Sequence, residues 1–213
     1  MNLALFYDTE TTGLPDFKAP SESAHQPHIV QLAALLVDMD TRETIQSMDV
    51  IVRPNGWAIP DKVAAVHGIT TEHAKAVGIP ERLAVEMFME LWNSRNRVAH
   101  NEQFDARILR IALMRHQGDI FHSPSGKSVP DIWKEGRAEC TARMATPICQ
   151  IPPTAKMVKA GFIKFKTPNL SEAYRHFTGG ELQNAHSAIA DVMACRDVYF
   201  EILNRSKSAG ISA

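Results

Sequence analysis

The sequence predicts an α/β domain in which helices pack on a mixed β-sheet. Strand-like apolar segments come first, and helical patterns then alternate with one further short strand, an order typical of layered α/β domains. A chain of 213 residues with 45% hydrophobic content can also bury one sizeable core. No long flexible linker separates the segments. We therefore expect one domain over residues 1–205, followed by a short C-terminal tail at 206–213.

The first half of the chain carries three predicted strands. Leu3 to Tyr7 is an apolar run without a breaker that ends at Asp8, which indicates a buried strand. Residues 14–28 contain three prolines and are predicted to form a loop. Two further apolar-rich strands, 29–38 and 44–53, flank a hairpin-like connection. Helical spacing follows in three segments, with Gly68 and Gly78 as stops: 60–68, 71–77 and 81–93.

The second half is predicted to be mainly helical. A short strand at 97–99 precedes a helix at 104–116, which begins near Asp105 and has apolar residues at helical spacing. Five glycines and prolines predict a long irregular insertion at 117–136. The run Asn169-Leu170-Ser171-Glu172 has the pattern of a capping box, opening a helix that Gly179 ends. The last helix is predicted from His186 to Asn204.

The net charge of −1 and the isoelectric point of about 6.8 argue against a protein that passively coats DNA. They do not argue against a nuclease, whose active site must be acidic to hold metal. One stretch is locally basic, because no acidic residue lies between Cys140 and Ser171. With Phe162 and Phe165 as stacking partners it is a candidate surface for phosphates, and a solvated loop with two core aromatics is an equally good interpretation. Its cations are Arg143, Lys156, Lys159, Lys164 and Lys166.

The cysteines and the N-terminus bear on the compartment. Three cysteines, an odd number without a CxxC pair, indicate neither a zinc site nor a disulfide framework. A reducing cytoplasm is the natural expectation. The N-terminal segment has no basic region and the chain has no apolar stretch of 18 residues. We therefore expect neither a signal peptide nor a membrane span.

The first candidate site lies at the end of the first strand. Asp8 and Glu10 alternate by two, so both side chains face the same side of the strand. Two adjacent carboxylates repel, and a divalent cation between them removes that penalty. Thr11, Thr12 and Gly13 follow, and their small size would let a substrate backbone come close. An isolated Asp-x-Glu is often only a surface turn, but this pair follows an unbroken apolar strand.

Two further acids and two histidines add to this site. Asp105 opens a helix, where the helix dipole alone would tolerate a negative charge, so by itself it is unremarkable. Asp191 lies among apolar helix residues and needs a partner, for which a metal is suitable. His186, five residues earlier, could take a proton from water near neutral pH. His67 suits a substrate contact or a structural turn equally well.

Together these segments resemble the three exonuclease motifs of the DEDDh (DnaQ-like) family of 3′→5′ exonucleases. The matching runs are Asp8-x-Glu10, Asn101-x-x-Phe104-Asp105 and His186-x-Ala188-x-x-Asp191, in that order. The segments 66–70 and 168–174 are also family-like, so the resemblance covers about residues 3–204. It implies an RNase H-like fold, with a five-stranded mixed sheet and helices on both faces.

The resemblance also implies a mechanism with two Mg²⁺ or Mn²⁺ ions, which in such sites lie about 3.5–4 Å apart. Asp8 would bridge both ions, Glu10 and Asp191 would complete the site of the water-activating ion, and Asp105 would support the other. His186 would be the general base. The products would be nucleoside 5′-monophosphates. The main chain at Thr11 and Thr12 would meet the terminal nucleotide, and the remaining proposed substrate contacts are Gly13, Leu14, His67, Asn101 and Phe104.

Several alternatives stay open at this stage. The chain is expected to act on nucleic acid with a 3′ end, but neither DNA nor RNA is favoured. The rival functions are a catalytically silent binding module, an RNase H-like endonuclease and an oligoribonuclease-like enzyme for very short RNA. A homodimer is left open, and a polymerase partner is not indicated. The loops 15–28 and 117–136 are longer than a minimal member of the family needs, and both would border the substrate groove.

Overall fold

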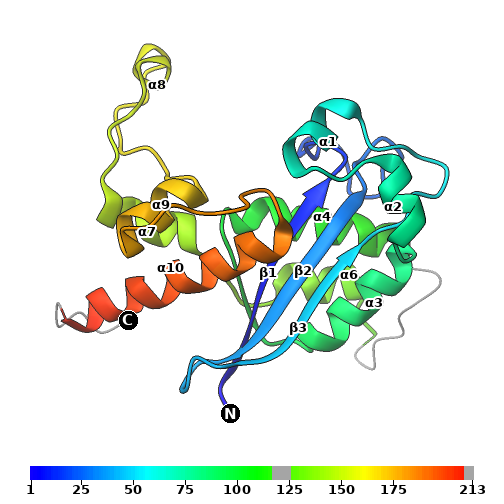
Figure 1. Cartoon of the computed structure of the whole chain (residues 1–213), viewed down its shortest axis with the longest axis horizontal. Coiled ribbons are helices and arrows are strands. Elements are labelled where there is room, and N and C mark those ends of the chain that lie inside the picture. The colour runs from blue at the N-terminus through cyan, green and yellow to red at the C-terminus, as the bar shows by residue number, and fades with distance from the viewer. Residues whose placement is uncertain (117–125, 209–213) are drawn as a thin grey trace.

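The computed structural model describes residues 1–116 and 126–208, and these residues contain five strands in one mixed sheet (Figure 1). The order across the sheet is β3-β2-β1-β4-β5. Strands β1, β2 and β3 form an antiparallel meander, whereas β4 and β5 run parallel to β1. The strands are β1 (Leu3–Thr11), β2 (Ile29–Asp38), β3 (Thr44–Ile51), β4 (Asn96–Ala99) and β5 (Ala138–Cys140). The predicted five-stranded mixed sheet is confirmed.

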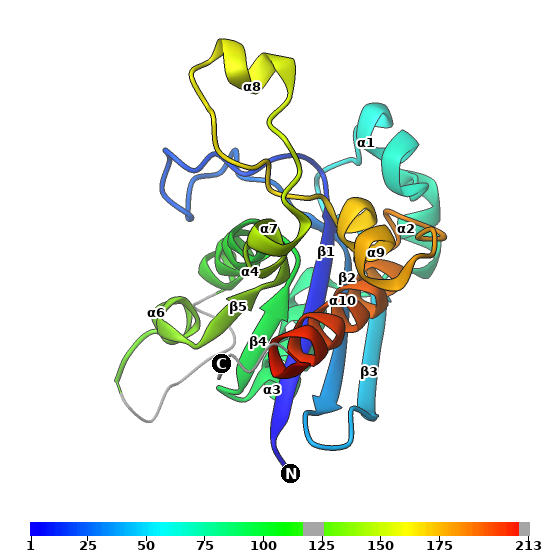
Figure 2. The ribbon, with the colours of Figure 1, turned by 90° about the vertical axis from the view of Figure 1, so that its left-hand side faces the viewer.

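Helices cover both faces of the sheet, as predicted (Figure 2). All ten residues of β2 are buried, because both of its faces lie under helices. On one face, α3, α4 and α6 build the larger hydrophobic cluster, which includes Phe88 and Trp133. On the other face, α10 packs on β1, β2 and β4. These helices are α3 (Glu81–Trp92), α4 (Glu102–Arg115), α6 (Val129–Glu135) and α10 (Ala188–Ser208).

The remaining helices of the described residues are α1 (Asp61–His67), α2 (Thr71–Val77), α7 (Thr141–Cys149), α8 (Ala155–Lys159) and α9 (Leu170–Thr178). The predicted capping box is present on α9, where Asn169 and Glu172 each accept a hydrogen bond from the other's backbone N–H at 2.8 Å. Gly179 ends that helix with a φ of 75°, a left-handed conformation that costs glycine little. None of the helices in the described residues is long and apolar enough to span a membrane.

Strand β1 does not end at Asp8 but continues to Thr11. Its polar residues stay in the sheet because β2 pairs with them: Asp8 lies opposite Ala33 and Glu10 opposite Gln31. The backbone hydrogen bonds of this long antiparallel pair outweigh the polar character of the side chains.

The last helix begins at Ala188, so the prediction that it starts at His186 is wrong. His186 has a φ of 68°, in the left-handed region, and Asn184 a φ of 54°. A right-handed helix cannot pass through such residues. His186 therefore lies on a loop directly before the helix rather than on its first turn.

The insertion at 117–136 is only partly irregular. Residues 117–125 lie outside the described part, and residues 129–135 form α6. Ser128 caps this helix by accepting a hydrogen bond from the backbone N–H of Asp131, and Pro130 stands in its first turn, where the missing N–H costs nothing. Strand β5 and helices α7 and α8 have no counterpart among the predicted elements.

Candidate active site

The alternation of side chains along β1 places Asp8 and Glu10 under one helix. Leu5 and Tyr7 belong to the cluster on the α3–α4 face, whereas Ala4 and Phe6 belong to the cluster under α10. Asp8 and Glu10 continue the second series, since side chains two residues apart share a face. Both carboxylates therefore leave the strand on the side of α10, and both are half-buried.

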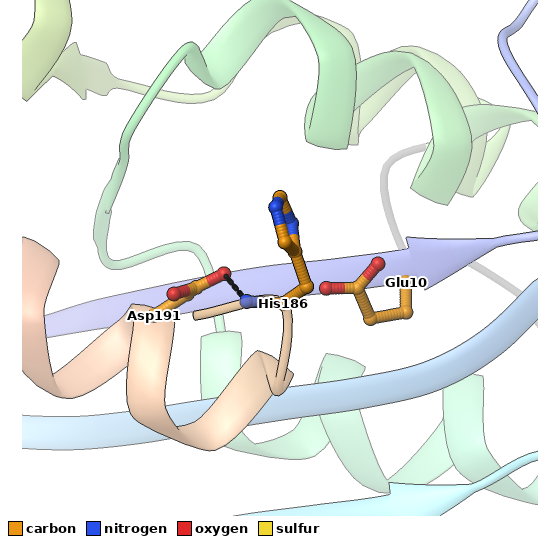
Figure 3. A group of neighbouring side chains, drawn as sticks. All are labelled: Glu10, His186 and Asp191. Atoms are coloured by element: carbon orange, nitrogen blue, oxygen red, sulfur yellow. Dashed lines mark hydrogen bonds between the residues drawn. The ribbon is translucent and has the colours of Figure 1, made fainter. Parts of the chain in front are cut away.

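The start of α10 brings a histidine and a third acid to the same place (Figure 3). Glu10, His186 and Asp191 each offer a ligand atom, and these atoms all lie within 4.8 Å of one another. The backbone N–H of His186 donates to Asp191 Oδ2 at 3.0 Å, so the left-handed turn is tied to the buried aspartate. The His186 ring itself is exposed. The arrangement suits a divalent cation on the carboxylates with an imidazole at its edge.

Asp105 reaches the site from the opposite layer of the fold. It is 2% exposed in the first turn of α4, and its Oδ1 accepts hydrogen bonds from the backbone N–H and the hydroxyl of Thr9, at 3.0 and 2.7 Å. Thr9 lies between Asp8 and Glu10 in β1 and faces the α4 side. Asp105 is thus held beside the two strand acids. It does not belong to the compact group of Glu10, His186 and Asp191.

Burial raises the pKa values of all four acids, and the charges of neighbouring site acids add to this at Asp8 and Glu10. Burial is the main cause that raises the pKa of Asp8 well above its usual range, and the charges of Asp105, Asp191 and Glu10 add to it. Burial and the charge of Asp191 raise the pKa of Glu10 to about 8. Burial raises the pKa of Asp105 to about 7, although its hydrogen bonds from Thr9 oppose the shift. Repelling carboxylates in one buried site fit a bound cation.

A further observation fits a metal at this site. Asp191 Oδ1 is buried and has no hydrogen-bond partner in the described part of the chain, while its other oxygen is held by His186. A buried carboxylate oxygen without a partner is costly. A hard divalent cation such as Mg²⁺ or Mn²⁺ prefers such oxygen ligands. The donor set therefore fits the expected metal.

The stability of the metal-free protein is expected to fall as the pH rises. A carboxyl whose pKa is raised in the folded state holds its proton more tightly there than in the unfolded chain. Its contribution to the free energy of unfolding is therefore complete below about pH 4, where it is protonated in both states. This contribution is lost as the pH rises through the pKa values of the folded state, about 8 for Glu10 and about 7 for Asp105. In EDTA, the melting temperature should therefore be lower at basic pH than at mildly acidic pH.

Thermal melts followed by circular dichroism across this pH range, with and without Mg²⁺, test this expectation. A Glu10→Gln variant removes one of the titrating groups and should show a shallower decline. A melting temperature in EDTA that stays flat or rises with pH would contradict the repulsion inferred among the acids.

The candidate substrate residues after β1 form a tight turn. The Thr11 hydroxyl donates to the carbonyl of Gly13 at 2.8 Å, and the Thr12 hydroxyl accepts from the backbone N–H of His28 at 2.9 Å. Both hydroxyls thus hold the chain itself. A Cβ added to Gly13 would meet nothing within 4 Å, so the space above it is open. Leu14 is 86% exposed, which leaves it available to a ligand.

The other candidate substrate residues differ in exposure. His67 accepts a hydrogen bond from the backbone N–H of Ile69 at 3.1 Å, but its buried Nε2 has no partner among the described residues. Burial and, less strongly, the charge of His186 lower the pKa of His67. Asn101 is exposed in the left-handed conformation at the start of α4. Phe104 is half-buried against the hydrophobic cluster of α3 and α4.

Three structural supports of the site were not assigned from the sequence. Glu102 accepts hydrogen bonds from Tyr7 and Arg97, at 3.2 and 3.0 Å, inside the core, which fixes the first turn of α4. Gln31 accepts from the backbone N–H of Ala188 at 3.1 Å and so holds the start of α10 on the sheet. His100 bonds to the Thr141 hydroxyl and the Pro168 carbonyl, at 2.9 and 3.0 Å. Of these three residues, only Gln31 carried a signal in the sequence, because it is a polar residue within an otherwise apolar strand.

A protein-family model described as an exonuclease, RNase T, matches residues 5–199. No curated protein matches the chain significantly. Among solved structures, Escherichia coli Exonuclease I in complex with a dT13 oligonucleotide has a TM-score of 0.73 at 18% identity, over 99% of this chain and 43% of that one. Exonuclease I from Methylocaldum szegediense has a TM-score of 0.69 at 18% identity, over 97% of this chain and 41% of that one.

These structural similarities confirm the predicted RNase H-like fold. At such low identity they carry no information on the substrate. The chain also spans less than half the length of these Exonuclease I proteins.

Proposed function

Since this chain belongs to the RNase T exonuclease family, we propose that it is a metal-dependent 3′→5′ exonuclease. It would hydrolyse the last phosphodiester of single-stranded DNA or RNA and release nucleoside 5′-monophosphates. The observation that carries the proposal is the group of Glu10, His186 and Asp191 where β1 and α10 come together, with Asp8 and Asp105 beside it. A core without catalytic function would gain nothing from four carboxylates whose pKa values are all raised by burial.

Two Mg²⁺ or Mn²⁺ ions would be held by Asp8, Glu10, Asp105 and Asp191. When bound, they would supply Lewis-acid stabilisation of the charge that develops on the phosphodiester. Asp8 suits a shared position because the charges of the other three acids all add to the rise of its pKa. The partnerless Oδ1 of Asp191 supports its assignment as a ligand.

His186 would act as the general base. Its exposed ring stands beside Glu10 and Asp191, at the border between the acids and solvent, where it can accept a proton from the attacking water. The water oxygen would then bond to phosphorus, and the bond to the 3′ oxygen of the preceding nucleotide would break. The left-handed turn bonded to Asp191 fixes where the ring leaves the backbone.

The terminal nucleotide would lie against the turn that follows β1. The open space at Gly13 and the exposed Leu14 suit a sugar and a base, and the main chain of Thr11 and Thr12 would meet its polar groups. His67, with its partnerless Nε2, would contact the terminal nucleotide next to His186. Phe104 would pack against a base, and Asn101 would help to order the site.

The partner of this site would be a nucleic acid with a 3′ end. Single-stranded DNA and single-stranded RNA are both to be tested, since neither polymer is favoured by the residues of the site. The proposed reaction requires neither a second copy of the chain nor a polymerase. The three cysteines are free, and a reducing cytoplasm stays our expectation for the compartment.

A gel time course with DNA and RNA oligonucleotides labelled at the 5′ end tests the function, in Mg²⁺, Mn²⁺ or EDTA. A metal-dependent ladder that shortens one nucleotide at a time from the 3′ end is expected. The faster polymer identifies the substrate class, and a length series separates a general exonuclease from an enzyme for very short RNA. Intact oligonucleotides that shift on a native gel would overturn catalysis in favour of a binding module, and internal cuts would indicate an endonuclease.

A further inference from the structure

Residues 150–168, which we call the α8 arm, connect α7 to α9 and stand away from the rest of the fold (Figures 1 and 2). In both views the arm projects beyond the sheet on the side where β1 ends, which is the side of the candidate active site. A backbone hydrogen bond from Lys166 to Ile151, 2.8 Å long, closes the base of the arm. Gly161, with a φ of 81°, turns the chain at its tip.

The arm presents large apolar side chains to solvent. Phe162 and Phe165 are 49% and 46% exposed, and Ile163 is 83% exposed. Together with Arg143, Thr146 and Pro147 of α7, this segment lines a cavity of about 590 Å³. A folded protein gains nothing from exposing neighbouring aromatic rings, and such patches mark binding surfaces. The alternative interpretation from the sequence placed the two rings in the core of a solvated loop. Its core placement is wrong, because neither ring belongs to a buried cluster in the described chain.

The charges around these rings have one sign. Residues 141–170 contain no acidic side chain. Lys166 pairs with Glu172 of α9. The other four cations are exposed and form no ion pair within the described part of the chain: Arg143, Lys156, Lys159 and Lys164. Cations without partners around exposed aromatic rings match a ligand that carries both phosphates and flat bases.

The arm is joined to the candidate active site through His100. This histidine directly precedes Asn101, and its two ring nitrogens contact Thr141 at the start of α7 and the Pro168 carbonyl at the end of the arm. Both ends of the segment that carries the rings are thus fixed next to the strand end that leads into Asp105. A polymer whose 3′ end lies at the acids would have its preceding nucleotides near this surface.

We propose that the α8 arm binds the single-stranded part of the substrate behind its 3′ end. Phe162 and Phe165 stack on bases, and Arg143, Lys156, Lys159 and Lys164 contact phosphates. This inference rests on the proposed function for its polymer, but the binding surface is separate from the carboxylates. It makes single-stranded nucleic acid the substrate, since bases in a duplex are already stacked on each other.

Fluorescence anisotropy in EDTA measures binding without cleavage, with 5′-labelled oligothymidylate and oligouridylate about 20 nucleotides long, enough to reach beyond one binding site. The double variant Phe162→Ala/Phe165→Ala should bind at least ~30-fold more weakly, because each stacked base contributes ~1–3 kcal/mol. The triple variant Lys156→Ala/Lys159→Ala/Lys164→Ala should lower the slope of log affinity against log salt by about 2. The matched control is Leu83→Ala/Met87→Ala, which removes two exposed apolar side chains from α3.

The outcomes separate this inference from the proposed function. Weaker binding by the arm variants, with unchanged melting temperatures and a control that binds like the unmodified protein, supports the arm even if no cleavage is seen. Arm variants that bind and degrade both polymers like the unmodified protein overturn the inference while leaving the exonuclease intact. Arm variants that lose self-association or binding to another protein, but still bind nucleic acid normally, would also overturn the inference. The arm would then be a protein-binding surface.

Discussion

Replacement of Asp8 by alanine is expected to abolish metal-dependent cleavage while leaving the fold intact. The charges of all three other site acids raise the pKa of Asp8, so its loss would remove the proposed central metal ligand. Without it the remaining acids hold an ion poorly, and the rate should fall below detection in the gel assay. The fold should persist because burial and the neighbouring charges raise the pKa of Asp8, and among residues 1–116 and 126–208 no interaction lowers it.

Thermal melts distinguish loss of metal from loss of structure. Mg²⁺ should raise the melting temperature of the unmodified protein by mass action and leave that of Asp8→Ala unchanged. In EDTA the variant should melt no lower than the unmodified protein. Asp8→Asn keeps the shape of the side chain and should behave in the same way. Asp40→Asn, in the exposed hairpin at 39–43, is the control for removal of one acid. Near-full activity of Asp8→Ala would contradict the proposal that Asp8 is a metal ligand.

Replacement of His186 by alanine is expected to slow cleavage ~10²–10⁴-fold, the usual contribution of a general base. The KM should change little, because the exposed ring is proposed to act on water and not to hold the substrate. The left-handed turn should survive, since it is the backbone N–H of His186 that bonds to Asp191. Rates at saturating substrate, compared with those of the surface variant His73→Ala, measure the effect.

The position of His186 allows a second role that the same variant tests. Its ring lies close enough to Glu10 and Asp191 to be a metal ligand itself. If His186 is a metal ligand, the His186→Ala variant should need more Mg²⁺ than the unmodified protein and should recover its rate at high Mg²⁺. If His186 is the general base, the variant should have an unchanged Mg²⁺ requirement and a low rate at every Mg²⁺ concentration. A purely weaker substrate affinity would contradict the base role altogether.

The proposed metal-binding and catalytic residues could be selected from the sequence because their types and spacing are unusual for a core. Asp8 and Glu10 follow an apolar strand at a spacing of two, which fixes their common face whatever the rest of the fold does. The structure places Asp191 and His186 on that same face. The capping box of α9 was equally predictable, because all of its interactions lie within four residues.

The elements that were missed depend on contacts that are distant in sequence. Strand β5 has only three residues, and nothing in Ala138–Cys140 marks it as a strand apart from its pairing with β4. Helix α6 was not predicted because Pro130 indicates irregular structure in the sequence, whereas it lies in the first turn of the helix. The helical period of α10 extended in the sequence to His186, but the bond from that residue to Asp191 sets a left-handed turn there.

The sequence by itself determined the acids, the histidine, the strand that carries the first pair and the layered α/β class, because each depends on residue type and local period. Only the tertiary structure decided how Asp105 is held by Thr9 and how His100 ties the α8 arm to the site. It also decided that Phe162 and Phe165 face solvent rather than a core. Burial and hydrogen bonding between distant segments are properties of the packed chain, and no local pattern of residues encodes them.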